Sequence, residues 1–156
     1  MPHAIIMNYP KFSVNVGTVM RTAELMGADK VVVSDPSRVS SIRHATDTAK
    51  SYRRIGMTTD TLTEAISLFP GRRIIAIEMS DNAVTLDDYD HPEDAVYILG
   101  SEDKGIDLDA YGHLIDDVIT IPSDRSWSLN VAIAHSMVEW DLRMKTRVRE
   151  PLLSST

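Results

Sequence analysis

Five short runs of hydrophobic residues divide this chain, and each run is almost free of polar side chains. They span residues 4–7, 30–33, 73–77, 95–99 and 118–121. Unbroken runs of this length, rich in Val and Ile and bounded by Gly, Pro or Asp, are typical of strands that are buried on both faces. The pattern therefore predicts five strands.

Between these runs, hydrophobic residues return at the spacing of a helix. The spacing predicts helices over residues 15–27, 61–69 and 128–146, whereas the basic segment 40–54 is either a helix or an ordered loop. Gly27 suits the end of the first helix, and Thr61 with Glu64 offers a capping box for the second. In the last helix one face is hydrophobic and carries Leu129, Ala132, Ile133, Met137 and Trp140.

Strands of this kind that alternate with helices indicate an α/β fold with a mostly parallel sheet covered by helices on both faces. We expect one domain over residues 1–149 and a loose tail over residues 150–156. Ligands of such folds bind beyond the carboxyl ends of the strands. The loops after Ile77, Leu99 and Ile121 are therefore the expected place for a site.

Composition excludes several classes of chemistry. The 156 residues include no Cys, which excludes disulfides and thiolate catalysis. No HExxH motif or Cys cluster offers a metal site, so we expect no metal. No hydrophobic run approaches the roughly 18 residues of a membrane span, and the first residues lack the charged region of a signal peptide. We therefore expect a cytoplasmic protein without membrane contact.

Charge is distributed unevenly along the chain. The formal net charge is −7, which by itself argues against binding of nucleic acid. Residues 1–73, however, hold 10 Lys and Arg against 6 Asp and Glu, whereas residues 74–124 hold 1 against 14. A chain polarised in this way can present a basic face, although charge blocks are also commonly solvated surface. Charge alone leaves both interpretations open.

Two stretches combine polar residues and glycines at the edges of predicted elements. Gly100 and Gly105, after the run 95–99, permit a tight turn or the close approach of a ligand to the backbone. At the start of the last helix, Ser128 suits an N-cap, whereas Asn130 is a mediocre helix former whose amide needs a partner. These residues provide either ordinary turn and cap chemistry or one wall of a site.

The first helix contains Gly17, which costs up to about 1 kcal/mol relative to Ala and indicates that something approaches its backbone closely. Asn15 and Arg21 flank this glycine. Arg21 stands among hydrophobic neighbours, so it either extends its guanidinium into solvent or clamps a phosphate or carboxylate.

Three segments together resemble the motifs of the SpoU/TrmH-like branch of the SPOUT RNA methyltransferases. They are residues 15–23, 98–105 and 121–131, and they occur in the family order. The resemblance spans nearly the whole chain. It implies an α/β domain whose C-terminal part threads a deep trefoil knot, with S-adenosylmethionine bound in the knot as the cofactor.

The same resemblance implies transfer of a methyl group to a ribose 2′-hydroxyl of RNA. It favours tRNA over rRNA, because relatives of one domain often act on tRNA. The alternative is an RNA-binding or cofactor-sensing protein that keeps the fold without turnover. Since the chain lacks the extra N-terminal RNA-binding domain of many relatives, we expect a homodimer. In that dimer the basic segment 38–54 of one subunit is expected near the pocket of the other.

Residue roles come from the matched motifs. The resemblance implies catalytic roles for Asn15, Arg21, Glu102, Ser128 and Asn130, with Arg21 engaging the target phosphate and helping to deprotonate the 2′-hydroxyl. It implies cofactor contacts for Met79, Leu99, Gly100, Ile121, Ser128 and Leu129, and those of Gly100, Ile121 and Leu129 are made largely through the backbone. The chain departs from the third motif at Ser123, Arg125 and Trp127, which alters either the cofactor affinity or the choice of RNA.

Overall fold

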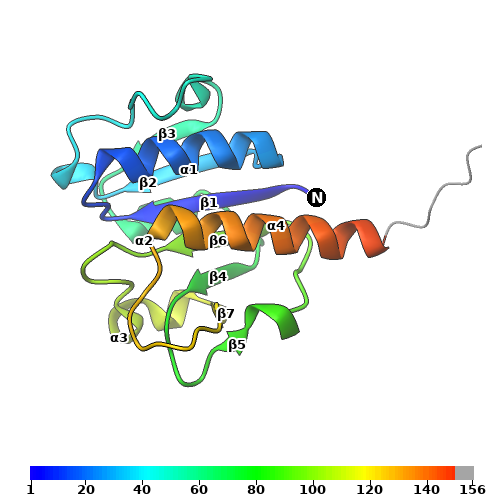
Figure 1. Cartoon of the computed structure of the whole chain (residues 1–156). Helices are drawn as coiled ribbons and strands as arrows, with labels where there is room; N and C mark the ends of the chain where they lie inside the picture. Colours follow the sequence, from blue (N-terminus) through cyan, green and yellow to red (C-terminus); the bar gives the residue numbers. More distant parts are fainter. Residues whose placement is uncertain (150–156) are drawn as a thin grey trace, which may run out of the picture.

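Seven strands form one sheet in the computed structural model, which describes residues 1–149 (Figure 1). Along the sheet their order is β3-β2-β1-β6-β4-β7-β5, and every neighbouring pair is parallel. The strands are β1 (His3–Asn8), β2 (Lys30–Ser34), β3 (Gly56–Thr59), β4 (Ile74–Ile77), β5 (Val84–Thr85), β6 (Ala95–Leu99) and β7 (Asp117–Thr120). The predicted parallel sheet is confirmed.

The two edge strands, β3 and β5, are the strands that the hydrophobic pattern did not predict. Each pairs with one neighbour only, β3 with β2 and β5 with β7. Both are short, and none of their residues is buried. An edge strand needs no unbroken hydrophobic run, because it is not covered on every side.

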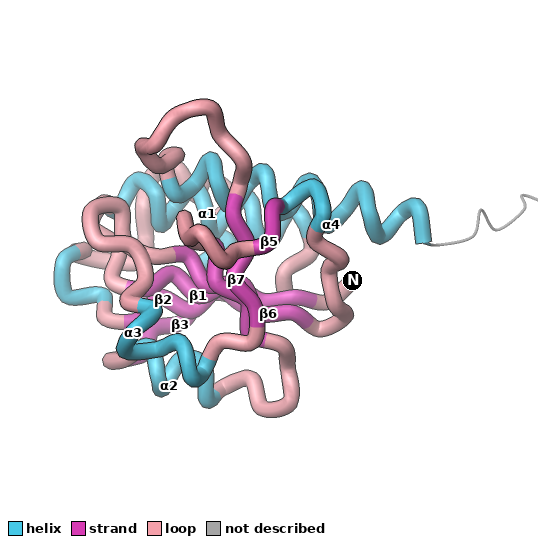
Figure 2. Tube along the Cα trace, turned by 90° about the horizontal axis from the view of Figure 1, so that it is seen from below, coloured by secondary structure: helices cyan, strands magenta, loops and turns pink. Residues whose placement is uncertain are grey.

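Helices cover both faces of the sheet, as predicted. Figure 2 shows α1 (Ser13–Met26) and α4 (Val131–Arg149) on one side of the strands, with α2 (Leu62–Ser67) and α3 (Leu108–Tyr111) on the other. Short 3-10 turns complete the chain: η1 (Pro36–Arg38), η2 (Ser51–Arg53), η3 (Leu86–Asp88) and η4 (Gly112–Leu114). The basic segment 40–54 is thus a loop with one such turn. None of the described helices is long and apolar enough to cross a membrane.

Alternate residues of each strand build two hydrophobic layers. In β1, Ile5 and Met7 belong to the layer beneath α1 and α4, whereas Ala4 and Ile6 belong to the layer above α2. This alternation is the two-residue period of a strand, and it explains why strands buried on both faces show no polar positions. The tail expected over residues 150–156 lies outside the described residues.

Two of the predicted helix ends are confirmed. Gly27 ends α1 with a φ of 96°, a left-handed conformation that favours glycine. Thr61 caps α2, since its side chain accepts a hydrogen bond from the Glu64 N–H at 3.1 Å. The Glu64 carboxylate in turn accepts from the Asp60 N–H, one residue before the usual partner in a capping box.

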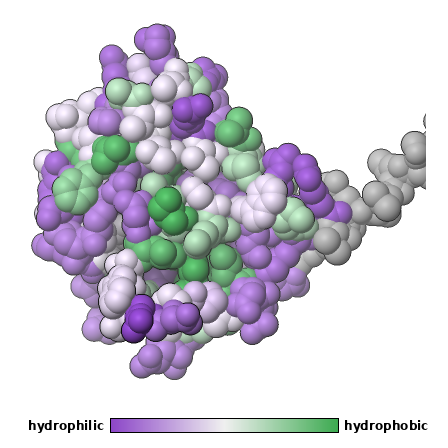
Figure 3. Space-filling view, viewed as in Figure 1, coloured by the Kyte–Doolittle hydropathy of each residue, from purple (hydrophilic) through white to green (hydrophobic). Residues whose placement is uncertain are grey.

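The start and the buried face of α4 differ from the sequence prediction. The helix begins at Val131 rather than at residue 128. Its buried stripe is Ala132, His135, Val138 and Leu142, whereas the predicted hydrophobic face leaves Ile133, Met137, Trp140 and also Met144 exposed. Figure 3 shows hydrophobic side chains gathered on the face of the molecule that α1 and α4 cover. The larger hydrophobic side chains of α4 therefore point away from the core of the protein.

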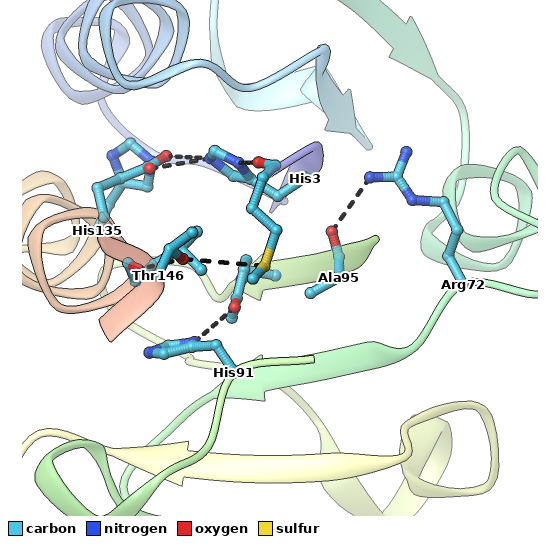
Figure 4. A network of polar contacts seen from close by, with 10 residues as sticks. His3, Arg72, His91, Ala95, His135 and Thr146 are labelled. Atoms are coloured by element: carbon cyan, nitrogen blue, oxygen red, sulfur yellow. Dashed lines mark hydrogen bonds and ion pairs between the residues drawn. The ribbon is translucent and has the colours of Figure 1, made fainter. Parts of the chain in front are cut away.

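Buried polar contacts explain why α4 turns the stripe that carries His135 toward the sheet. The Glu139 carboxylate accepts hydrogen bonds at 2.9 Å from both the His3 and the His135 rings, and all three side chains are buried. Figure 4 shows His3 and His135 pointing toward one another. His91 makes a similar contact with Asp141, at 2.9 Å. A buried carboxylate requires such partners, and these contacts fix the rotation of α4 against the sheet.

Candidate functional site

The loops after β4, β6 and β7 converge on one cavity of about 490 Å³ at the carboxyl edge of the sheet. The strands point to this edge, which lies at the left of Figure 1. The cavity is lined by every residue for which we predicted a cofactor contact, namely Met79, Leu99, Gly100, Ile121, Ser128 and Leu129. Sequence positions more than forty residues apart thus share one wall, as expected for the switch region of a parallel sheet.

The 100–105 loop requires glycine at both ends. A Cβ on Gly100 would lie 2.5 Å from the carbonyl carbon of Gly105, which means that the two ends of the loop are in contact. Gly105 itself has a φ of 64°, and the Ser101 and Gly105 backbones form an antiparallel bridge. The tight turn that Gly100 and Gly105 predicted is therefore confirmed, and it forms one side of the cavity.

Glu78 is a site residue that the sequence analysis missed. Its carboxylate accepts hydrogen bonds from the Ile106 N–H at 2.8 Å and from the Met79 N–H at 2.9 Å. A Cβ on Gly105 would lie 2.5 Å from the same carboxylate. Glu78 thus joins the loop after β4 to the loop after β6. Its position immediately after a buried strand was the available signal.

Glu102 links the cavity to the start of α1. Its carboxylate accepts hydrogen bonds from the Lys11 N–H at 2.7 Å, from the Phe12 N–H at 3.3 Å and from the Asn15 side-chain amide at 2.9 Å. A negative group is favourable there, because the N-terminus of a helix carries unpaired N–H groups and a partial positive charge. Of the predicted catalytic residues, Glu102 and Ser128 line the cavity.

Asn130 completes a chain of side-chain contacts that starts at Glu102. The Asn130 amide donates to Asn15 Oδ1 at 3.2 Å, and Asn15 donates to Glu102. The Asn130 Oδ1 atom accepts from the backbone N–H groups of Ala132 and Ile133, at 2.9 and 3.2 Å. Asn130 is therefore the N-cap of α4, and the cap role considered for Ser128 is wrong. The sequence predicts that the Asn130 amide needs a partner, and Asn15 is that partner.

Arg21 lies apart from these contacts. It is exposed on α1, and among the described residues it makes no hydrogen bond or ion pair and does not line the cavity. Arg21 is six positions along the chain from Asn15, which corresponds to about 9 Å along a helix. The structure therefore brings Asn15, Glu102 and Asn130 together, places Ser128 on the cavity wall, and leaves the Arg21 guanidinium free for a ligand.

Arg38 and Asp103 form an ion pair beside the cavity. The guanidinium contacts the Asp103 carboxylate at 2.9 Å, and it lies over the Tyr9 ring, 3.8 Å from the centroid. The hydrogen bond with Arg38 lowers the pKa of Asp103 to about 2. Arg54 is likewise paired with Glu24. Two cations of the basic segment 38–54 are thus neutralised within their own chain, and only the others remain for a partner.

The close approach predicted at Gly17 is made by the chain itself. A Cβ there would clash with the Thr46 hydroxyl and lie 2.8 Å from the His44 side chain. The Thr46 hydroxyl also donates to the Val14 carbonyl at 3.1 Å. Gly17 therefore docks the basic segment against α1, next to Arg21. Residues 1–149 contain no group of three or more His, Cys, Asp or Glu side chains suited to a metal ion.

Comparison with known sequences identifies a matching family and a similar enzyme. The model of the SpoU rRNA Methylase family matches residues 2–140. The tRNA (guanosine(18)-2'-O)-methyltransferase of Escherichia coli (strain K12) is 28% identical over 130 residues, which cover 81% of this chain. The match covers 56% of that enzyme, so the chain spans about half the length of this relative.

Two solved structures share the fold over nearly the whole chain. One comes from work on the 2-OH methylation of C/U34 on tRNA, with a TM-score of 0.80, 19% identity, and coverage of 95% of this chain and 98% of that one. The other is the SpoU methyltransferase AviRb from Streptomyces viridochromogenes in complex with AdoMet. Its TM-score is 0.74 at 21% identity, covering 94% of this chain and 57% of that one.

Proposed function

The chain belongs to the SpoU rRNA methylase family, and on that basis we propose that it methylates a ribose 2′-hydroxyl of RNA with S-adenosylmethionine. One observation carries the proposal: the three motif segments meet, through Asn15, Glu102 and Asn130, beside a cavity at the carboxyl edge of the sheet. A shared fold alone would not suffice, because function belongs to sites rather than to folds.

The cavity fits the proposed cofactor. A volume of about 490 Å³ lies within the range of small-molecule sites. Glu78 and Glu102 stand on its wall and form no ion pair with any described residue, and carboxylates favour a ligand that carries positive charge. We propose that Met79, Leu99, Gly100, Ile121, Ser128 and Leu129 hold S-adenosylmethionine. When bound, it supplies an electrophilic methyl group.

The chain's own residues then have to position and activate the ribose. A 2′-hydroxyl is a poor nucleophile until its proton leaves, so catalysis requires alignment and stabilisation of the developing alkoxide. Arg21, free of protein partners, binds the phosphate beside that hydroxyl and stabilises its deprotonated form. The Glu102 carboxylate is occupied by three N–H donors, so it and Asn15 orient the start of α1 instead.

Transfer RNA is the substrate we favour, because the relative from Escherichia coli is named for guanosine 18 of tRNA and one similar structure concerns tRNA. We propose that the protein acts in the cytoplasm, where tRNA is modified. The test is incubation with methyl-labelled S-adenosylmethionine and tRNA, followed by mass spectrometry of the nucleosides. We expect a 2′-O-methylated nucleoside, and no label on tRNA with a 2′-deoxy sugar at that position. RNA binding without any transfer would favour the non-catalytic alternative.

We also propose a homodimer, with a second copy covering the exposed stripe of α4. Ile133, Met137, Trp140 and Met144 recur along about 16 Å of helix, and Trp140 is 58% exposed. Large hydrophobic side chains aligned in this way mark an interface, and a two-fold axis lets the same stripe pack against itself. The cations left unpaired in the basic segment, Arg43, Lys50 and Arg53, would then extend the surface around the partner's cavity.

Light scattering tests the dimer. The wild-type protein should have twice the mass of one chain at micromolar concentration, and Met137→Lys with Trp140→Lys should yield monomers. A matched variant with Leu68→Lys, which charges an exposed hydrophobic residue next to α2, should remain dimeric. A wild-type monomer that retains full activity would contradict the proposal.

We infer that residues 1–149 form one domain whose C-terminal part threads a trefoil knot. The order of β6, β4 and β7 in the sheet supports it, because the chain places β4 between two strands that follow it in sequence. Mechanical extension from the two termini tests the knot. A tightened knot retains residues, so the end-to-end distance of the stretched chain should be shorter than that of an unknotted chain with the same number of residues.

A further inference from the structure

Trp127 is an exposed aromatic residue on the rim of the cavity. It is 71% exposed, more than any other Trp, Phe or Tyr of the described residues. It lines the cavity together with Ser126 and Ser128, so its neighbours along the chain are polar. No hydrophobic core explains its position. A large exposed ring beside a binding cavity is typical of a residue that a ligand covers.

The loop that carries Trp127 contains a turn and leads directly to Asn130. The Ser123 hydroxyl donates to the Arg125 carbonyl at 2.9 Å, which closes a turn before Trp127. Three residues after Trp127, Asn130 is fixed by α4 and by Asn15. The ring is therefore tethered within a few residues of the Glu102–Asn15–Asn130 contacts.

Arg125 adds a free positive charge to the same place. Its guanidinium lies 5.9 Å from the Trp127 ring centroid, and it forms no ion pair with any described residue. By contrast, Arg38 is paired with Asp103, which lines the cavity. The Arg125 charge is thus available for an anionic ligand, such as a phosphate.

The overall charge of the chain explains why a stacking contact would be needed. Proteins usually hold RNA through many Lys and Arg contacts to phosphate, but this chain carries a net charge of −7. Stacking of a base on an aromatic ring contributes affinity without net charge, and it requires a base that is not already stacked in a duplex. Single-stranded RNA satisfies that requirement.

We propose that Trp127 is the stacking platform for an unpaired nucleobase next to the methylated ribose, with Arg125 contacting the phosphate of the same nucleotide. This rests on the proposed function, since it places RNA at the mouth of the cavity. It assigns the departure of residues 123–127 from the family motif to the choice of RNA, and not to the affinity for the cofactor.

Intrinsic fluorescence tests the contact directly, because the chain has only two Trp residues. In the Trp140→Phe protein, Trp127 is the sole tryptophan. Unfractionated Escherichia coli tRNA and an unstructured oligouridylate should quench its fluorescence, whereas a blunt RNA duplex of equal phosphate content and S-adenosylhomocysteine should not. Quenching by S-adenosylhomocysteine alone would show that the cofactor's adenine covers the ring, and would overturn the proposal. Absence of quenching by any RNA would overturn it as well.

Binding assays provide a second measurement that does not depend on the Trp140 variant. Trp127→Ala should weaken tRNA binding about tenfold, Trp127→Phe should weaken it much less, and S-adenosylhomocysteine binding should be unchanged in both. Leu68→Ala removes an exposed hydrophobic side chain next to α2, on the other face of the sheet, and should leave tRNA binding unchanged.

Fluorescence and binding assays involve no methyl transfer. The stacking role of Trp127 and the proposed methyltransferase function can therefore be refuted independently of one another. A protein that binds RNA through Trp127 without transferring a methyl group contradicts the proposed function alone. Methyl transfer and tRNA binding that are both insensitive to Trp127→Ala contradict the stacking platform alone.

Discussion

The Asn130 side chain donates a hydrogen bond to Asn15 across 3.2 Å and so joins positions 115 residues apart in the sequence. The same side chain caps α4 through its oxygen. Because the cap fixes which atom is the oxygen, the amide nitrogen must face Asn15. Asn15 is then oriented to donate to Glu102. The side chain that caps α4 therefore also orients Asn15 toward Glu102.

Asn130→Asp separates the cap from the amide contact. Asp is as good an N-cap as Asn, so the contribution of the cap to the free energy of unfolding should be kept. The variant loses the N–H donor and sets a carboxylate against Asn15 Oδ1. We expect methyl transfer to fall about tenfold or more, as the loss of about 1.4 kcal/mol would produce. Urea unfolding and single-turnover transfer measure the two effects.

The control for this variant is Thr61→Ala, which removes the cap of α2 on the opposite face of the sheet. It should lower the free energy of unfolding by about 1 kcal/mol and leave methyl transfer unchanged. Full activity of Asn130→Asp would mean that the contact with Asn15 has no part in catalysis.

Arg21→Ala should lower methyl transfer by about 10³-fold, because stabilisation of the charged reacting groups is lost. Folding should not suffer, since Arg21 is exposed and makes no hydrogen bond or ion pair with the described residues. Arg21→Lys should also be poor, because Lys keeps the charge but not the planar fork. Calorimetry should show unchanged binding of S-adenosylmethionine. The matched variant Arg143→Ala, on the exposed side of α4, should be fully active; a folded Arg21→Ala protein with normal turnover would refute the catalytic role.

Gly105→Ala should destabilise the protein more than Gly27→Ala does. Both glycines have positive φ, at 64° and 96°, but only at Gly105 would the new Cβ meet another group, the Glu78 carboxylate. Gly27→Ala should therefore cost about 1 kcal/mol from backbone strain, while Gly105→Ala adds the displacement of Glu78 and weakens cofactor binding.

The double variant Gly105→Ala with Glu78→Ala identifies the cause of that difference. If the clash is responsible, the double variant should lose less free energy of unfolding than the sum of the losses in the two single variants. Strict additivity would show that Glu78 and the loop after β6 are not coupled.

Stability should depend on pH through His3. Burial lowers the pKa of His3, but the hydrogen bond and the charge of Glu139 outweigh it and raise the pKa above 6.5. In the window from pH 6.5 upward, the folded protein therefore holds a proton that the unfolded chain has released. The stabilising contribution of His3 is complete below pH 6.5 and is lost as the pH rises through the folded pKa.

His3→Gln should remove this loss, since Gln can still donate to Glu139 but does not titrate. Urea unfolding at a series of pH values above 6.5 should show a flatter profile for His3→Gln than for the wild type. Burial lowers the pKa of His91, and the nearby charge of His3 lowers it further, so His91 titrates below the pH range of this comparison. The exposed His113→Gln should reproduce the wild-type profile. Identical profiles for His3→Gln and the wild type would contradict the assignment.

Features that depend on a few neighbouring residues could be predicted from the sequence. The buried strands, the end of α1 at Gly27, the Thr61 cap and the tight loop between Gly100 and Gly105 all belong to this group. Each follows from a local period, a required backbone angle or a side chain that reaches its own helix. The parallel sheet then places the loops after β4, β6 and β7 at one edge, so the cavity wall could also be predicted.

Only the tertiary structure decided which long-range partners the polar residues take. Asn130 rather than Ser128 caps α4, Glu78 joins two loops, and Arg38 pairs with Asp103 in its own chain. The rotation of α4 follows the same cause: His135 and Glu139 face inward because His3, far away in sequence, satisfies the carboxylate. Periodicity ranks residues by hydrophobicity, whereas the burial of a polar group depends on the partner that the fold brings to it.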